Sequence, residues 1–257
     1  MPIPLKKFFL EDPRLSRAHR IYIQVFGIPI SGLRIRLRRI LPKIEGNFSS
    51  ILDLGCGKGL FTFALSQKFP DAKVIGVDID EEQIHANQTI AKKHNLTNIE
   101  FKVQDILKME FENEFDLILS VDNLEHIEED DFLLTKIRAA LKPGGKFVCH
   151  VPALKRIWVF KKMAINFDVP GHARPGYEKE VLGEKFTRAG LSLQVLTMTY
   201  GYLETVSNNL SYLVTGARQK NAGAYALIFP FLNLMSWIGR KQDPKNRGAG
   251  VFAIATK

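Results

Sequence analysis

From residue 51 onward the chain alternates short apolar runs with longer amphipathic ones. Runs such as FDLILS are continuously apolar, as strands are when both faces of a parallel sheet are covered. The segments between them have the length and the 3.6-residue periodicity of helices. Alternating strands and helices predict an α/β fold with a parallel, doubly wound sheet. Strands are expected at 51–54, 72–78, 99–105, 115–120, 146–151, 191–199 and 249–256, and helices at 60–69, 80–95, 128–141 and 178–190.

Two segments depart from this alternation. Residues 1–48 are basic and rich in apolar side chains, and residues 200–247 separate two strands that a short link would ordinarily join. Because structureless loops of that length are uncommon in compact domains, we expect helices in the second segment. The chain therefore divides into an N-terminal basic helical cap at 1–48, a core at 49–199, a helical insertion at 200–247 and a final core strand at 248–257.

In the sequence ILDLGCGKGLF, a predicted strand runs into three glycines at alternate positions, Gly55, Gly57 and Gly59. Glycine allows a positive φ and a close approach of a ligand to the backbone, and a helix N-terminus offers free N–H groups. A strand, a glycine-rich turn and a helix are therefore typical of nucleotide sites. The spacing is neither the dinucleotide-binding G-x-G-x-x-G nor the phosphate-binding loop that ends in G-K-[ST]. A tight turn without a ligand is the alternative interpretation.

Three further stretches follow or end later predicted strands. Asp78 in GVDID ends the second strand, Asp105 in VQDI ends the third, and FDLILSVDNLEHI followed by LKPGGKFVCHV covers the fourth and fifth. Together with the glycine turn and Asp53 before it, they resemble the class I S-adenosylmethionine-dependent methyltransferases. DNLEHI is similar to the small-molecule branch that includes ubiquinone-type O-methyltransferases. The resemblance covers residues 51–193 and the final strand. It implies a Rossmann-like seven-stranded sheet whose last strand is antiparallel.

The resemblance also implies where S-adenosylmethionine, the expected cofactor, would bind. Its methionine part would lie against the glycine turn, with Asp53 orienting the loop or the amino group. Asp78 would accept hydrogen bonds from the ribose hydroxyls. Asp105 would face the adenine amino group, with Ile106 beside the ring. The expected cofactor-binding residues are Asp53, Gly55, Cys56, Gly57, Gly59, Asp78, Ile79, Asp105, Ile106 and Val121.

Two histidines are candidates for a catalytic base. Methyl transfer from a sulfonium depends largely on positioning, and a base is needed only when the acceptor must lose a proton. His126 follows the fourth strand, at the edge where α/β sheets bind ligands, and is the first candidate. Holding the loop by local hydrogen bonds is its alternative role. His172 in PGHARPGY is the second candidate, and Asp122 and Asn123 are candidates for lining the acceptor site.

The acceptor is expected to be a small molecule that is methylated at oxygen. Family members that methylate nucleobase amines carry an acidic residue or Asn followed by Pro-Pro-aromatic after the fourth strand, whereas this chain has DNLE. No cluster of His and Cys has the spacing of a zinc site, so no metal is expected. Cys56 and Cys149 are the only cysteines, and no basic-then-apolar leader opens the chain. A cytoplasmic location is therefore the expectation.

The net charge of +9 is unevenly distributed. Residues 1–50 hold 10 Lys and Arg against 3 Asp and Glu, residues 51–150 hold 11 against 18, and residues 151–257 hold 15 against 6. The basic flanks, and not the core, would therefore meet an anionic partner. An RNA methyltransferase is the first alternative function, although no RNA-binding module is recognisable and nucleic acid is disfavoured. A non-catalytic protein at a membrane surface that retains the fold is the second.

Two segments in these flanks bear on peripheral membrane contact. SGLRIRLRRILPKI at 31–44 predicts an amphipathic helix, which either covers the cofactor site with its arginines in water or lies on an anionic membrane. The run at 221–239 is uncharged, follows Arg218 and Lys220, and is nearly as long as a spanning helix. Pro230 and the return to the sheet argue against spanning. A buried lid and an interfacial hairpin are the alternatives. Either would give the acceptor site apolar walls, so we expect an apolar or lipid-linked acceptor.

Overall fold

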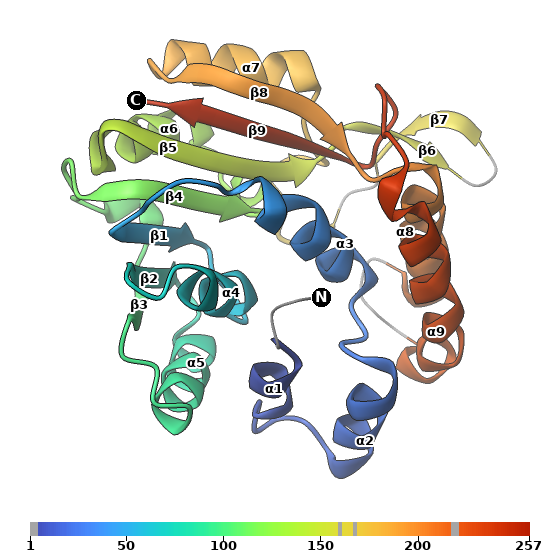
Figure 1. The fold of residues 1–257 in the computed structure, drawn as a ribbon. Helices are drawn as coiled ribbons and strands as arrows, with labels where there is room; N and C mark the ends of the chain where they lie inside the picture. Colours follow the sequence, from blue (N-terminus) through green and yellow to red (C-terminus); the bar gives the residue numbers. More distant parts are fainter. Residues whose placement is uncertain (1–4, 159–160, 167–168, 217–220) are drawn as a thin grey trace.

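The computed structural model describes residues 5–158, 161–166, 169–216 and 221–257. Its centre is a seven-stranded sheet in the order β3-β2-β1-β4-β5-β9-β8 (Figure 1). Neighbouring strands are parallel, except that β9 runs antiparallel to β5 and to β8. The expected fold class is thereby confirmed. The strands of the sheet are β1 Ser50–Leu54, β2 Lys73–Asp78, β3 Ile99–Val103, β4 Phe115–Val121, β5 Leu141–Pro152, β8 Ser192–Thr199 and β9 Gly250–Thr256.

Helices cover both faces of the sheet, which is why its strands are apolar on both sides (Figure 1). On one face α6 and α7 bury Leu133 and Phe186 in the core. On the other face α1, α4 and α5 bury Phe8, Phe63 and Ile84. The helices are α1 Leu5–Leu10, α2 Arg17–Phe26, α3 Ser31–Ile40, α4 Leu60–Lys68, α5 Glu81–Lys93, α6 Asp130–Ala140, α7 Lys179–Arg188, α8 Tyr202–Thr215 and α9 Ala222–Ile238, with 3₁₀ turns η1 Leu41–Lys43, η2 Ile106–Lys108, η3 Leu124–His126 and η4 Gly239–Lys241.

The strand order places four loops along one edge of the sheet. Strands β3, β2, β1 and β4 are adjacent and parallel, so the loops that follow them leave the sheet at the same edge. The chain passes from β1 to β2 on one side, whereas β4 pairs with β1 on the other side. The order of the strands therefore reverses between β1 and β4. Open α/β sheets bind ligands at the carboxyl edge beside such a reversal.

Several boundaries differ from those expected. The helix expected at 128–141 is shorter, because α6 ends at Ala140 and β5 begins at Leu141. Pro143 within β5 biases the residue before it toward extended backbone, so the helix does not continue. The third strand ends at Val103. Strands β6 Lys155–Trp158 and β7 Lys161–Ile165 form an antiparallel hairpin between β5 and α7, which the hydrophobic pattern did not predict.

Ion pairs from the basic helix α3 join the N-terminal cap to the rest of the protein. The carboxylate of Glu204 on α8 is fully buried and lies 2.7 Å from Arg38 and 2.6 Å from Arg39. Arg36 pairs with Asp122, after β4, at 2.7 Å. These three arginines therefore face carboxylates of the same chain, and both positions expected for them, in water or on a membrane, are wrong. The partner carboxylates come from distant parts of the sequence, which the pattern of one helix does not show.

The insertion is polar inside and apolar outside. The buried side chains of α8 are Glu204, Thr205, Ser207, Asn208, Asn209 and Ser211. On α9 only Phe229, Leu232 and Ser236 are buried, and five of its large apolar side chains are exposed. The expectation that the insertion would supply apolar walls to the acceptor site stays a prediction, since the buried side chains of α8 bond to α3, α9 and β6. Arg218 and Lys220 lie outside the described residues.

Candidate active site

The loop between β1 and α4 is built on glycine. Gly55, Gly57 and Gly59 have φ angles of 67°, 47° and 66°, a region that other residues rarely adopt. The Cys56 N–H donates to the Val77 carbonyl at 2.9 Å and so ties the loop to β2. A Cβ added to Gly57 would meet no atom within 4 Å, so the space beside this backbone is open. A ligand can therefore lie directly against the loop.

Asp53 lies at the base of this loop and is 2% exposed. Its Oδ2 accepts a hydrogen bond from the Thr62 hydroxyl at 2.7 Å. Burial raises the pKa of Asp53 to about 7, while the bond from Thr62 lowers it and the nearby charge of Asp78 raises it further. The carboxyl is therefore close to half-ionised at neutral pH, and a cation bound beside it would favour the ionised form.

Asp78 at the end of β2 faces the glycine loop. Its Oδ2 accepts a hydrogen bond from the Gly57 N–H at 2.8 Å, and its Oδ1 accepts one from the Asp80 N–H at 3.0 Å. The next residue, Ile79, is 73% exposed and offers an apolar surface beside these polar groups. Val121 ends β4 and is partly buried. The structure thus brings the expected residues of β1 and β2 together and places Val121 on the adjacent strand.

Asp105 and Ile106 lie farther along the same edge, after β3. The Oδ1 of Asp105 accepts a hydrogen bond from the Leu107 N–H at 3.0 Å, and its Oδ2 lies 3.4 Å from the Lys108 ammonium. Ile106 is only 7% exposed, because η2 directs it into the core. The expected contact between Ile106 and the adenine ring stays a prediction, and little of the Ile106 surface is available for it.

A buried polar network follows β4. Asp122 has a φ of 50°, and its carboxylate lies 2.6 Å from Nδ1 of His150 and 2.7 Å from Arg36. Nε2 of His150 lies 2.8 Å from the Thr199 hydroxyl. Burial alone would raise the pKa of Asp122, but Arg36 and His150 hold it below its ordinary value. Because an ionised carboxylate only accepts, Nδ1 of His150 carries a proton, and Nε2 shares a hydrogen bond with the Thr199 hydroxyl. Both ring nitrogens of His150 are therefore occupied, and it is not a free base.

The two histidines expected at the acceptor site lie together. The rings of His126 and His172 meet edge to face with centroids 4.4 Å apart. His126 is exposed, and its Nδ1 lies 2.9 Å from the Gly171 carbonyl oxygen. Since a carbonyl only accepts, Nδ1 of His126 carries a proton, so in the neutral ring Nε2 is the nitrogen that keeps the lone pair. The local hydrogen bond and the role as a base, which were alternatives in the sequence, are therefore compatible.

Glu125 is a candidate residue that the sequence analysis missed. It is 1% exposed, and its Oε2 has no hydrogen-bond partner among the described residues. Burial, followed by the charge of Asp122, raises the pKa of Glu125 well above the ordinary value. One ligand atom from each of Glu125, His126 and His172 lies within 4.8 Å of the others, a set that could hold a metal ion. The expectation of no metal, which rested on sequence spacing, stays a prediction.

Arg174 fixes the loop that carries His172. Its guanidinium donates to the Ile127 carbonyl at 2.9 Å and to the Asp130 carboxylate at 2.8 Å. The Tyr177 hydroxyl donates to the same carboxylate at 2.7 Å. Sequence reasoning missed these residues, although Arg174 and Tyr177 stand in the PGHARPGY stretch from which only the histidine was selected.

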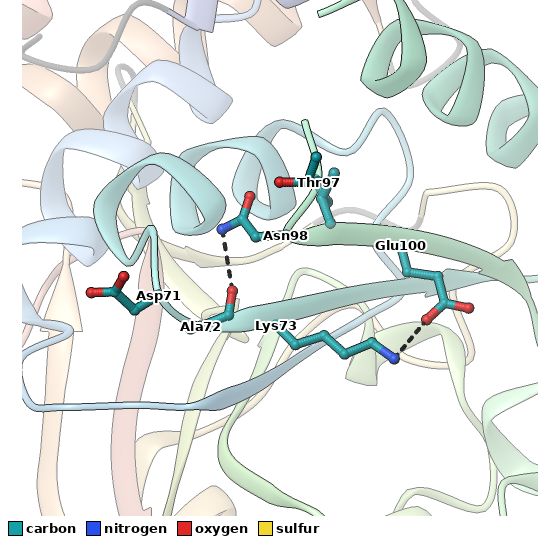
Figure 2. Close-up of a pocket in the computed structure, with 7 residues that line it drawn as sticks. Asp71, Ala72, Lys73, Thr97, Asn98 and Glu100 are labelled. Carbon is teal, nitrogen blue, oxygen red and sulfur yellow. Dashed lines mark hydrogen bonds and ion pairs between the residues drawn. The ribbon is translucent and has the colours of Figure 1, made fainter. Parts of the chain in front are cut away.

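A separate hollow of about 490 Å³ lies at the opposite edge of the sheet. It is lined by residues at the beginnings of β2 and β3, where the Lys73 ammonium lies 3.1 Å from Glu100 and the Asn98 amide donates to the Ala72 carbonyl at 3.2 Å (Figure 2). Parallel strands present their amino ends there, away from the glycine loop. None of the expected site residues lines this hollow, and we assign it no function.

The glycine loop and the acidic strand ends agree with what is found in known proteins. A family model described as "Methyltransferase domain" matches residues 47–190, more than half of the chain. This chain belongs to the class I S-adenosylmethionine-dependent methyltransferases. The cofactor of the methyltransferase is therefore S-adenosylmethionine. The open space beside Gly57, with the Asp78 carboxylate next to it, fits a ligand that carries hydroxyl groups.

Curated relatives of the methyltransferase differ in the atom that their names say is methylated. It is 35% identical over 103 residues to (S)-coclaurine N-methyltransferase of Thalictrum flavum subsp. glaucum, a match that covers 40% of this chain and 28% of that protein. It is 34% identical over 113 residues to the ubiquinone biosynthesis O-methyltransferase of Coxiella burnetii, covering 44% and 47%. The matches span less than half the length of these relatives. They support methyl transfer and leave the acceptor open.

A solved structure shows the same fold over nearly the whole chain. Phosphoethanolamine N-methyltransferase 2 of Haemonchus contortus, in complex with S-adenosyl-L-methionine, matches 98% of the methyltransferase and 60% of its own chain. The TM-score is 0.61 and the sequence identity is 18%. At this identity the likeness concerns the fold, including the cap before β1 and the insertion before β9, and does not transfer an acceptor.

Proposed function

We propose that the methyltransferase acts on the oxygen of a small, lipid-linked acceptor, with His126 as the general base. S-adenosylmethionine supplies a methyl group that is already activated as a sulfonium. The observation that carries the proposal is the hydrogen bond of His126, whose Nδ1–H is held by the Gly171 carbonyl, which leaves Nε2 as the atom that would accept a proton. Asp53, the backbone at Gly57 and Asp78 would hold the cofactor, because their open, acidic surface fits it.

The proton of the acceptor hydroxyl has a defined destination in this arrangement. As the new bond between oxygen and the methyl carbon forms, Nε2 of His126 takes the hydroxyl proton. The Gly171 carbonyl, 2.9 Å from Nδ1, continues to accept a hydrogen bond and stabilises the charged ring. His172 packs against the ring edge to face and restricts its rotation. The products are the methyl ether, S-adenosylhomocysteine and a protonated histidine, which returns its proton to water.

The insertion supports a lipid-linked acceptor over a wholly apolar one. The buried side chains of α8 are hydroxyl, amide and carboxylate groups, and Oδ1 of Asn209 has no hydrogen-bond partner among the described residues, which suits a polar head. The apolar side chains of α9 instead lie on the outside of the protein. A molecule with a polar, methylatable head and an apolar tail would use both surfaces, whereas a uniformly apolar acceptor would offer no hydrogen bond to the Asn209 oxygen.

The first test compares acceptors that share one head group. Phenols and quinols with isoprenoid tails of increasing length are supplied with S-adenosylmethionine, and the formation of S-adenosylhomocysteine is measured. We expect kcat/KM to rise with tail length. A response that is flat across the series contradicts the lipid-linked acceptor, although it leaves methyl transfer itself intact.

The second test removes the base. His126→Gln should lower kcat by about 100-fold or more, whereas the Kd for S-adenosylmethionine, measured by calorimetry, should not change. His85→Gln, at an exposed position on α5, is the matched control. A kcat equal to that of the wild type would exclude His126 as the base.

A further inference from the structure

The outer side of α9 is a stripe of exposed apolar side chains. Its members recur at helical spacing and project away from the buried Phe229, Leu232 and Ser236. We call this stripe the α9 face. It consists of Leu227, Phe231, Leu234, Trp237 and Ile238, which are 84%, 65%, 54%, 51% and 56% exposed. Contiguous apolar surface of this kind marks a contact with another molecule or with a membrane.

Helix α2 extends this surface. The Tyr22 hydroxyl donates a hydrogen bond to the Ala226 carbonyl at 2.6 Å, which fixes α2 beside α9 (Figure 1). Ile21 and Val25 lie on the side of α2 opposite the buried Ile23 and are 54% and 68% exposed. Two neighbouring helices from opposite ends of the sequence therefore both turn apolar side chains outward.

Unpaired cations accompany these apolar side chains. Neither α2 nor α9 contains an Asp or a Glu. Arg34 stands at the junction of the two helices, with its guanidinium 5.7 Å from the Phe229 ring and bonded to the Phe26 carbonyl. The cations of this region that form no ion pair with any described residue include Arg17, Arg34, Arg240 and Lys241. In α3, by contrast, Arg36, Arg38 and Arg39 all face carboxylates.

We infer that the α9 face, with α2, docks on the surface of an anionic lipid membrane. Apolar side chains with a basic fringe and no acidic residues are what an interfacial helix presents to anionic headgroups. Trp237 carries the Arg240 guanidinium 3.7 Å from its ring centroid, an aromatic and a cationic group together at the end of the helix, as membrane interfaces favour. The biological role of this docking rests on the proposed function, since docking on a membrane would bring the protein to a lipid-linked acceptor.

The same observations disfavour two other arrangements. A two-fold contact with a second copy would place the same unpaired cations opposite one another. Crossing the membrane is permitted by length and composition for the 20 residues Ala222–Lys241. Crossing would, however, separate Ser236 from α3, where Arg38 donates to the Ser236 carbonyl at 3.0 Å. An interfacial position keeps this bond and leaves both ends of α9 on the side of the sheet.

Vesicle flotation tests the inference with the whole chain. Large unilamellar vesicles of phosphatidylcholine alone and of phosphatidylcholine with phosphatidylglycerol are compared at low and high salt. We expect binding to the anionic vesicles that weakens with salt. The double variant Leu227→Ser, Phe231→Ser should weaken this binding by about ten-fold or more. Phe132→Ser, at a residue on α6 that is 48% exposed, is the matched control and should bind as the wild type does.

Fluorescence of Trp237 supplies an independent measurement. The chain has two tryptophans, so a Trp158→Phe background isolates Trp237, whose emission should shift to the blue on anionic vesicles. Absence of binding to either vesicle, or equal binding by the double variant, overturns the inference. A dimer in the wild type that the double variant dissociates, without vesicle binding, would assign the surface to a second copy. Calorimetric titration of the same protein with S-adenosylmethionine shows whether the cofactor site is intact. A failure to bind vesicles can therefore be told apart from a failure of the methyltransferase itself.

Discussion

Replacing Asp53 by Asn removes a buried carboxyl while keeping its shape and its hydrogen bond from Thr62. The carboxyl is 2% exposed, and the bond from the Thr62 hydroxyl is 2.7 Å long. Burial raises the pKa of Asp53 in the folded protein from 3.8 to about 7. The folded protein therefore holds a proton, between about pH 4 and pH 7, that the unfolded chain has released.

This difference gives the stability a pH dependence of defined sign. Where the folded state binds more protons than the unfolded state, the free energy of unfolding falls as pH rises. Each unit of difference in pKa between the folded and the unfolded state is worth about 1.4 kcal/mol. The pKa of Asp53 rises from 3.8 to about 7 on folding, so this carboxyl makes the free energy of unfolding of the wild type lower at pH 8 than at pH 4 by about 4 kcal/mol. Asn carries no charge, so Asp53→Asn should be more stable than the wild type at pH 8 by up to that amount. The difference in free energy of unfolding between the variant and the wild type should become smaller as pH falls toward 4.

Urea unfolding followed by circular dichroism, from about pH 5 to about pH 8.5, measures this difference. A difference between the proteins that does not change with pH, or a variant that is less stable at pH 8, would refute the reasoning. The variant should also bind S-adenosylmethionine less tightly at pH 8, because only the ionised carboxyl attracts a cationic amino group. Stability gained and affinity lost by one substitution would show that the buried carboxyl is kept for binding.

Three further outcomes are expected. Glu204→Gln should lower the free energy of unfolding by about 2–3 kcal/mol in urea titrations, because two arginines lose their shared buried carboxylate. The control Arg188→Gln breaks an exposed ion pair and should change the free energy of unfolding by less than about 0.5 kcal/mol. Asp78→Asn should weaken S-adenosylmethionine binding by about ten-fold or more in calorimetry, because a charged acceptor is lost; an unchanged Kd would place the ribose elsewhere. Chelation with EDTA should leave the activity unchanged, whereas a loss that a divalent cation restores would make the cluster around His126 a metal centre.

The fold was predictable because its determinants are local in the sequence. Strands covered on both faces read as continuous apolar runs, and helix-length crossovers between them require parallel pairing. The glycine loop was also predictable, since Gly55, Gly57 and Gly59 all adopt the positive φ that favours this residue. The likeness of the strand ends to one enzyme family then identified the cofactor.

The surroundings of the site were not predictable, because they depend on contacts between distant segments. The arginines of α3 form a basic stripe in the sequence, but Asp122 and Glu204, which neutralise them, belong to other elements. The position of Glu125 is a similar case. The raised pKa of Glu125 follows from burial and from the neighbouring Asp122, and neither property is visible in DNLEHI.

The insertion shows why an uncharged run misled the interpretation of the acceptor site. The run at 221–239 favoured apolar walls, but α9 exposes several of its apolar side chains and α8 buries polar ones. Hydrogen bonds and ion pairs hold them in place, among them the bond from the Ser207 hydroxyl to the Leu232 carbonyl at 2.8 Å and the bonds of Glu204 to α3. Because polar contacts attach the insertion to the core, the α9 face is not needed for attachment and is available to a membrane.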